Sequence, residues 1–90
     1  MKKVKFKKRK EHEKFSDSME KNGLIVGDFV FLITEKGSYV DVTVTECGDT
    51  VEGPYVGEVS YIEEEEGLDV HFGSLVEFNF SNVHKVSLRV

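Results

Sequence analysis

The sequence predicts a mainly β fold, either a small five-stranded SH3-like antiparallel barrel or a strongly curved sheet, with a short N-terminal helix. Three observations predict it. The chain has 90 residues, which is enough for one domain with one core. Valine and phenylalanine are its commonest apolar residues and alanine is absent, a balance that favours strands over helices. Several short segments alternate apolar and polar residues, and turn-forming residues separate them.

The first 22 residues differ from the rest in pattern. Residues 1–10 form a basic arm that we expect to be mobile, because its like charges repel one another. The lysines on either side of Val4 and Phe6 leave open a short strand with one apolar face. Residues 11–22 predict a short helix, since two apolar residues four positions apart share one face and a glycine follows. We therefore expect one domain over residues 11–90, with the arm attached to it.

Two strands are expected after the helix. Residues 29–34 are six apolar or β-branched residues in a row, which predicts a strand covered on both faces. Residues 39–46 place Val40, Val42 and Val44 between polar residues. This period of two is typical of a strand with one buried and one solvated face.

Three further strands complete the expected sheet. The region 50–62 predicts a strand that a Gly-Pro pair interrupts as an edge, bulge or bend, and Gly57 marks strong local curvature. Residues 75–80 and 86–90 alternate apolar and polar positions and predict the last two strands. Closure into a barrel removes exposed strand edges, and the alternative is a half-open sheet with the residue 11–22 helix packed on it.

The segment 26–86 also carries a series of short motifs. A Gly-Asp strand start at 27–30, an aromatic-Val-x-Val strand at 39–42, a Gly-Asp-Thr hairpin at 48–53 and a closing strand at 73–83 follow one another. In these motifs, which cover about two thirds of the chain, the sequence resembles the uncharacterised bacterial YegJ-like domain family. The resemblance implies a compact β domain and no particular activity.

Charge is divided between the two ends of the chain. Residues 1–14 contain eight Lys or Arg and two Glu, a net charge of +6, whereas residues 15–90 contain four Lys or Arg and fifteen Asp or Glu, a net charge of −11. An acidic body can dock on a basic site of another protein. We therefore predict a non-enzymatic protein-binding module, an inhibitor or adaptor with a protein partner. The acidic residues expected to carry the binding are Glu58, Glu63, Glu64, Glu65, Glu66 and Asp69.

Two other interactions stay open. A small barrel with a basic arm can bind nucleic acid, because cations neutralise phosphates and an aromatic ring stacks on a base. The residues for this alternative are Lys5, Phe6, Lys7, Lys8, Arg9 and Lys10. The chain can also self-associate through an exposed strand edge near Gly53 and Pro54.

The sequence contains no recognisable catalytic, cofactor or metal motif. A phosphate-binding loop, a dinucleotide fingerprint and a nucleophile elbow are all absent, and the three histidines are far apart. We expect no enzyme activity, no cofactor and no metal. The single cysteine, Cys47, cannot form an internal disulfide, and no apolar run approaches the ~18 residues that span a membrane. These two observations predict a cytoplasmic protein.

Overall fold

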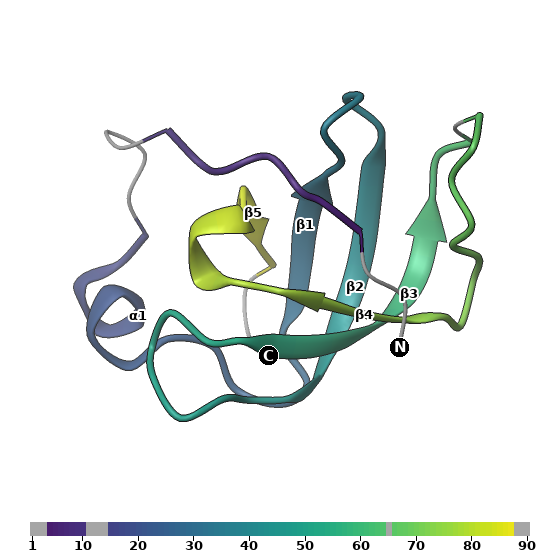
Figure 1. The fold of residues 1–90 in the computed structure, drawn as a ribbon. Coiled ribbons are helices and arrows are strands. Elements are labelled where there is room, and N and C mark those ends of the chain that lie inside the picture. The colour runs from purple at the N-terminus through teal and green to yellow at the C-terminus, as the bar shows by residue number, and fades with distance from the viewer. Residues whose placement is uncertain (1–3, 11–14, 65, 88–90) are drawn as a thin grey trace.

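The chain folds into one five-stranded antiparallel sheet (Figure 1). A computed structural model describes residues 4–10, 15–64 and 66–87. Its elements are α1 (Asp17–Asn22), β1 (Phe29–Ile33), β2 (Tyr39–Glu46), β3 (Tyr55–Ile62), β4 (Leu75–Phe78), the 3-10 turn η1 (Phe80–Asn82) and β5 (Lys85–Val86). The strands lie in the order β4-β3-β2-β1-β5, with every neighbouring pair antiparallel. Among the described residues the two outer strands, β4 and β5, do not pair with each other, so the sheet is not closed.

This arrangement confirms a mainly β fold with five strands and a short helix. The described helix is shorter than the predicted one. Ser16 caps it, with its Oγ accepting a hydrogen bond from the backbone N–H of Met19 at 3.3 Å, and residues 11–14 lie outside the described residues. The last strand is also short, because β5 has two residues and residues 88–90 lie outside the described part of the chain.

The strand predicted at residues 29–34 is not covered on both faces, as the sequence had suggested. In β1, Val30 and Leu32 are buried in the core, whereas Phe29 is 53% exposed and Phe31 is half-buried. The outward residues of this strand are themselves apolar, and this composition hides the period of two in the sequence. The outer face of β1 is therefore an apolar surface.

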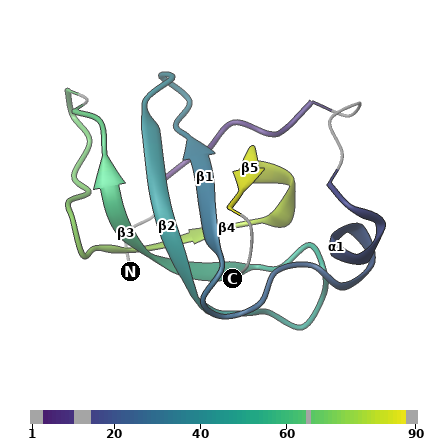
Figure 2. The same ribbon diagram turned by 180° about the vertical axis from the view of Figure 1, so that it is seen from behind.

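Gly57 allows the sheet to curve, as its sequence position predicted. The residue is buried where β3 lies against β2, and a Cβ at this position would be 3.1 Å from the carbonyl oxygen of Thr43 and from side-chain atoms of Val42. Two register shifts between β2 and β3 lie on either side of this point, and each indicates a bulge. β3 consequently bends along its length: residues 55–58, at its start, pair with β4 on one edge, and residues 56–62 pair with β2 on the other edge (Figures 1 and 2).

The core lies on the inner side of the curved sheet. Its most deeply buried side chains are Leu32, Val40, Val42, Val44, Tyr55, Val59, Val76 and Val83. Residues 4–10 run across the opening that the unclosed sheet leaves, and Phe6 joins this core from there (Figure 1). The segment expected to be an arm is thus part of the packed structure.

The hydroxyl of Tyr55 links β3 to two earlier segments of the chain. Its hydroxyl donates a hydrogen bond to the carbonyl oxygen of Val51 at 2.6 Å and accepts one from the backbone N–H of Leu24 at 3.2 Å. Burial raises the pKa of Tyr55 above its ordinary value of 10.0. The hydroxyl also occupies the space that a Cβ at Gly23 would need, and Gly23 has a φ of 76°. Only glycine fits at this helix end without strain.

We predict that Tyr55→Phe lowers the free energy of unfolding by about 1–2 kcal/mol at neutral pH, because one buried and one partly buried backbone group lose a partner. A raised folded-state pKa means that the tyrosine's contribution is complete below about pH 10 and is lost as the pH rises through the folded-state value. The difference between wild type and Tyr55→Phe in urea unfolding should therefore shrink above pH 10. Tyr39→Phe, at an exposed position, is the control, and an equal effect in that variant would contradict the prediction.

Candidate functional site

The β3–β4 loop, residues 63–74, is a long connection held at both ends by backbone hydrogen bonds. Near its start, the N–H of Glu63 donates to the carbonyl oxygen of Tyr39 at 3.0 Å. Near its end, the N–H of Gly73 donates to the carbonyl oxygen of Val59 at 2.8 Å. Lys36, from the β1–β2 turn, donates from Nζ to the carbonyl oxygen of Glu66 at 3.0 Å. The loop is therefore anchored on the sheet and not free of it.

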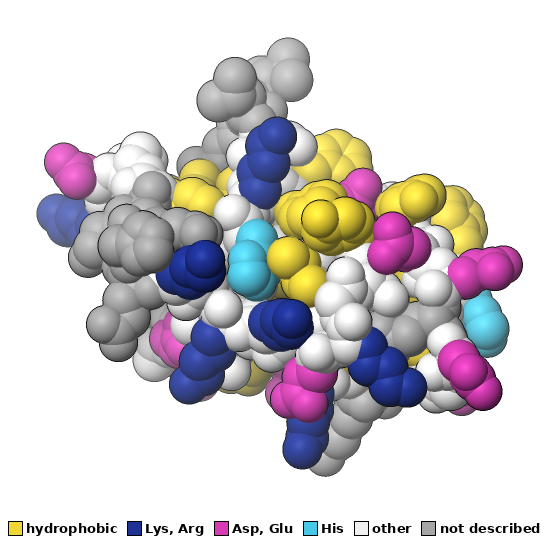
Figure 3. Space-filling view, turned by 90° about the horizontal axis from the view of Figure 1, so that it is seen from above, with side chains coloured by type: hydrophobic (Ala, Val, Ile, Leu, Met, Phe, Trp, Pro, Cys, Tyr) yellow, Lys and Arg dark blue, Asp and Glu magenta, His cyan; other side chains and the backbone are white. Residues whose placement is uncertain are grey.

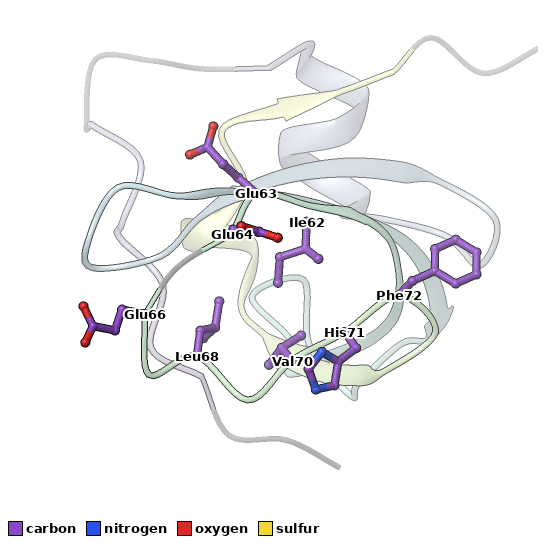
Figure 4. Close-up of a pocket in the computed structure, with 8 residues that line it drawn as sticks. All are labelled: Ile62, Glu63, Glu64, Glu66, Leu68, Val70, His71 and Phe72. Carbon is purple, nitrogen blue, oxygen red and sulfur yellow. The ribbon is translucent and has the colours of Figure 1, made fainter.

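This loop surrounds a surface hollow of about 740 Å³ with an apolar floor (Figure 4). Ile62, Leu68 and Val70 provide the floor, and Val70 is buried. Phe72 lies at the rim and is 76% exposed, which makes it the most exposed large apolar side chain among the described residues. In Figure 4 its ring points away from the rest of the loop.

Three carboxylates line one side of the hollow (Figure 4). Glu63, Glu64 and Glu66 line it and are exposed to solvent. Their carboxylates make no hydrogen bond or ion pair with any residue that the structure describes. Asp69 lies 3.5 Å from His71 Nε2, an ion pair only when the imidazole is protonated. The loop thus combines negative charge in water with exposed apolar surface.

Two residues of the predicted acidic surface are not part of this hollow. Glu58 is exposed on β3, opposite Thr43 on one side and Leu75 on the other, and it does not line the hollow. Glu65 lies outside the described residues. The described acidic site is therefore the loop, without the strand that precedes it.

Residues 4–10 pack against the body, in contrast to the mobile arm expected from their charge. Phe6 and Thr34 form an antiparallel bridge, and the N–H of Lys7 donates to the carbonyl oxygen of Ile33 at 2.8 Å. The side chain of Phe6 is only 9% exposed, and Asn82 Nδ2 donates to its carbonyl oxygen at 3.1 Å. The proposal that Phe6 stacks on a nucleic-acid base is therefore wrong, because this ring is a core residue.

Arg9 is also occupied within the fold. Its Nη1 donates to the carbonyl oxygens of Phe80 and Val83 at 2.9 and 2.8 Å. Its guanidinium carbon lies 4.4 Å from the ring centroid of Phe15 and 4.9 Å from that of Phe80. This cation fastens the start of the chain to η1, so it is a structural residue and not an open phosphate contact. The remaining predicted residues, Lys5, Lys7, Lys8 and Lys10, are exposed.

The strand edge expected near Gly53 and Pro54 is not exposed for self-association. Gly53 forms a bridge with Thr50 just before β3. The carbonyl oxygen of Glu52 accepts a hydrogen bond from the N–H of Phe80 at 2.8 Å, and β3 then pairs with β2 on one side and β4 on the other. The backbone at this point is already paired within the molecule.

Sequence reasoning missed a second surface, the outer face of the sheet. Phe29, Tyr39 and Tyr61 are exposed there on three neighbouring strands. The signal was present in the sequence, because an apolar strand with no covering layer leaves alternate rings in water, but only the strand register shows that these rings lie together.

The rest of the described chain offers no metal site and no membrane span. Among the described residues, no group of three or more His, Cys, Asp or Glu side chains is placed to hold a metal ion. No described helix is both long enough and apolar enough to cross a bilayer. No protein family, curated protein or solved structure matches this chain, and the resemblance to YegJ-like domains stays a prediction.

We predict that Phe6→Ala lowers the free energy of unfolding by about 3–5 kcal/mol, because it leaves a cavity where the start of the chain closes the core. This is a large part of the ~5–15 kcal/mol that stabilises a typical domain. Urea unfolding followed by circular dichroism measures the change. Lys8→Ala, an exposed position two residues along, is the control and should change stability by no more than about 0.5 kcal/mol. Equal stability of the two variants would show that Phe6 is not a core residue.

Proposed function

We propose that this protein is a non-enzymatic binding module whose β3–β4 loop docks on a basic, partly apolar surface of another protein. The observation that carries the proposal is the pairing of free carboxylates with exposed apolar surface in one anchored loop. A partner that inserts cations and an apolar group there would be held by both kinds of contact. Occupation of a partner's basic site is the mode of action of an inhibitor or adaptor.

The carboxylates supply attraction and orientation. The carboxylates of Glu63, Glu64 and Glu66 form no ion pair with a described cation, since the Lys36 ammonium contacts the backbone carbonyl of Glu66, so their field extends into solvent over a Debye length of ~10 Å. A negative patch of this kind raises the association rate with a positive surface and disfavours acidic partners. The expected binding is therefore sensitive to salt.

Phe72 supplies the apolar anchor. A ring that is 76% exposed gains the full benefit of burial only when another molecule covers it. Binding energy in protein interfaces is concentrated in a few buried aromatic or arginine residues, with charged residues around them. The loop offers both kinds of residue around one hollow, with Phe72 across it from Glu63, Glu64 and Glu66 (Figure 4).

We predict that the double charge reversal Glu63→Lys with Glu64→Lys reduces capture of a native basic partner by about tenfold or more, the effect of ~1.4 kcal/mol. The measurement is affinity capture from lysate, quantified by mass spectrometry, with the strongest partner then titrated in purified form. Phe72→Ser should weaken the same complex.

Control variants distinguish an effect of the loop residues from an effect of the protein's net charge. Glu46→Lys with Asp49→Lys makes the same change of charge at exposed positions away from the loop, and Val26→Ser removes another exposed apolar side chain. Both controls should keep the complex. If the control reversal weakens capture as much as the loop reversal does, the loop is not the site.

A second candidate function rests on the exposed lysines of the first ten residues. Lysine and arginine side chains gather across one part of the face shown in Figure 3, and this surface could hold the phosphates of a single-stranded nucleic acid. Deletion of residues 1–10 is a poor test of this idea, because it would remove Phe6 from the core. Charge reversal leaves the packing in place.

We predict for this second function that Lys8→Glu with Lys10→Glu lowers the slope of log affinity against log salt by about 1.4, the value for two phosphate contacts on a single strand. Fluorescence anisotropy with a labelled single-stranded oligonucleotide measures it, and Lys21→Glu, at an exposed position in α1, is the control. Absence of binding by the wild-type chain at low salt would rule the function out.

The proposal also covers the type of sheet and the compartment in which the protein acts. We infer an SH3-like sheet, supported by the strand order β4-β3-β2-β1-β5 and by the 3-10 turn η1 between the last two strands. The single cysteine, Cys47, supports a reducing compartment such as the cytoplasm.

A further inference from the structure

The outer face of β1 forms an exposed apolar ridge with no described covering layer. Phe29, Phe31 and Ile33 point outward along it, and Phe29 is the most exposed of the three. The ring centroids of Phe31 and Tyr39 lie 4.8 Å apart, so the ridge continues onto β2. A shallow hollow of about 490 Å³ lies on this face, with Phe29, Phe31, Asp41, Tyr61 and Lys85 in its lining.

Two opposite charges lie on either side of the centre of this ridge. Phe31 pairs across the sheet with Asp41 on β2 and with Lys85 on β5. Neighbouring strands are about 4.8 Å apart, so the two charged residues flank Phe31 at similar distances and in opposite directions. Neither side chain makes a hydrogen bond or an ion pair with another described residue. The central row of this face, Lys85–Phe31–Asp41, therefore carries one cation and one anion that have no described ion-pair partner.

Ile33 and Phe29, the outward residues on either side of Phe31 along β1, also have chemically different neighbours on their two sides. Lys7 donates its backbone N–H to Ile33, and its neighbour Phe6 points inward, so the Lys7 side chain lies on the outer face beside Ile33. Ser87 donates its backbone N–H to Phe29 at 3.0 Å. Read across β1, the three rows are Lys85–Phe31–Asp41, Lys7–Ile33–Tyr39 and Ser87–Phe29–Thr43.

We propose that this face binds a second copy of the same chain, with a two-fold axis that runs parallel to β1 just above the sheet. This operation places each apolar residue of β1 over its own copy and exchanges the residues on its two sides. The cross-copy pairs are then Lys85 with Asp41, Lys7 with Tyr39, and Ser87 with Thr43. They are an ion pair, a cation–π contact and a pair of hydroxyls.

The charge pattern selects this arrangement over the other face-to-face dimer. A two-fold axis across the strands would place Lys85 over Lys85 and Asp41 over Asp41, so like charges would face each other. A partner of uniform charge would likewise meet one like charge on this face. In the selected arrangement the strands of the two copies stay nearly aligned, as in sheets that pack about 10 Å apart within ~30° of each other.

The small size of this face limits the expected affinity of the dimer. Three rows of three residues are fewer than the ~20–30 residues a side of a standard interface, so the dimer should be weak, with a dissociation constant on the order of 100 μM. None of these residues lines the hollow of the β3–β4 loop. Self-association is therefore independent of the partner binding proposed above.

Sedimentation equilibrium from about 10 μM to 1 mM tests the proposal. The wild-type chain should show a monomer–dimer equilibrium. Asp41→Lys alone and Lys85→Asp alone each place like charges opposite each other, so each should raise the dissociation constant tenfold or more. The double variant that exchanges the two charges restores both ion pairs and should dimerise as the wild type does.

A mixture of the two single variants tests directly whether residues 41 and 85 pair between the two copies. Copies with Lys at 41 and 85 and copies with Asp at both positions should form a heterodimer although neither forms a homodimer. Phe29→Ser should also weaken the wild-type dimer, whereas Phe72→Ser, which removes a more exposed ring off this face, should leave it unchanged. Circular dichroism and urea unfolding verify that each variant is folded, and Asp41→Asn and Lys85→Gln replace any that is not.

The proposal is overturned if the wild-type chain is monomeric at 1 mM or if single charge reversals leave the dimer intact. It is also overturned if a mixture of the two single variants forms no heterodimer. Dimerisation that Phe72→Ser abolishes would place the contact at the β3–β4 loop and would also overturn it.

Discussion

The fold depends on residues 4–10 closing a sheet that does not close by itself. The outer strands β4 and β5 do not pair within the described chain, so the inner valines would meet water at this opening. Phe6 fills it, and Arg9 holds the segment through two carbonyl hydrogen bonds and two ring contacts. A charged side chain thus performs a packing role, with its cation satisfied by backbone oxygens and aromatic faces.

The same segment organises the surface charge. Alternation along an extended chain directs Phe6 inward and its lysine neighbours outward, so core closure and a basic surface come from one stretch of sequence. Lys7 borders the aromatic face of β1, and the acidic loop at residues 63–74 lies between β3 and β4. A domain of this size consequently offers three surfaces of different chemistry, each on a rigid part of the sheet or anchored to it.

The parts of the fold that depend on local pattern could be predicted, and the parts that depend on distant pairing could not. The period of two at residues 39–46 predicted β2, and Gly57 predicted the bend, because a strand's buried face and its close contacts leave a direct mark on the sequence. The first residues were misjudged in spite of their alternation, since like charges suggested mobility. The pairing that decides their structure is with Thr34, about thirty positions away.

In the candidate sites, too, local features could be predicted from the sequence and contacts between distant residues could not. The sequence singled out Glu63, Glu64 and Glu66 as acidic binding residues, but it did not show that Ile62 and Leu68 line the same hollow as an apolar floor. Residues 29–34 suggested a fully covered strand, because composition alone does not show whether a second layer exists. The opposite charges beside Phe31 lie more than forty positions apart in the chain, and only the register of β1 with β2 and β5 brings them into one row.

The contacts of Arg9 have a consequence for biosynthesis. Its two carbonyl acceptors belong to residues 71 and 74 positions later in the chain. At a translation rate of ~5–20 residues per second, the early segment waits about 4–15 s before both acceptors have been made. During that interval the nascent polypeptide exposes the ring that later completes its interior, so a ribosome-bound intermediate would be the form most open to chaperones and proteases.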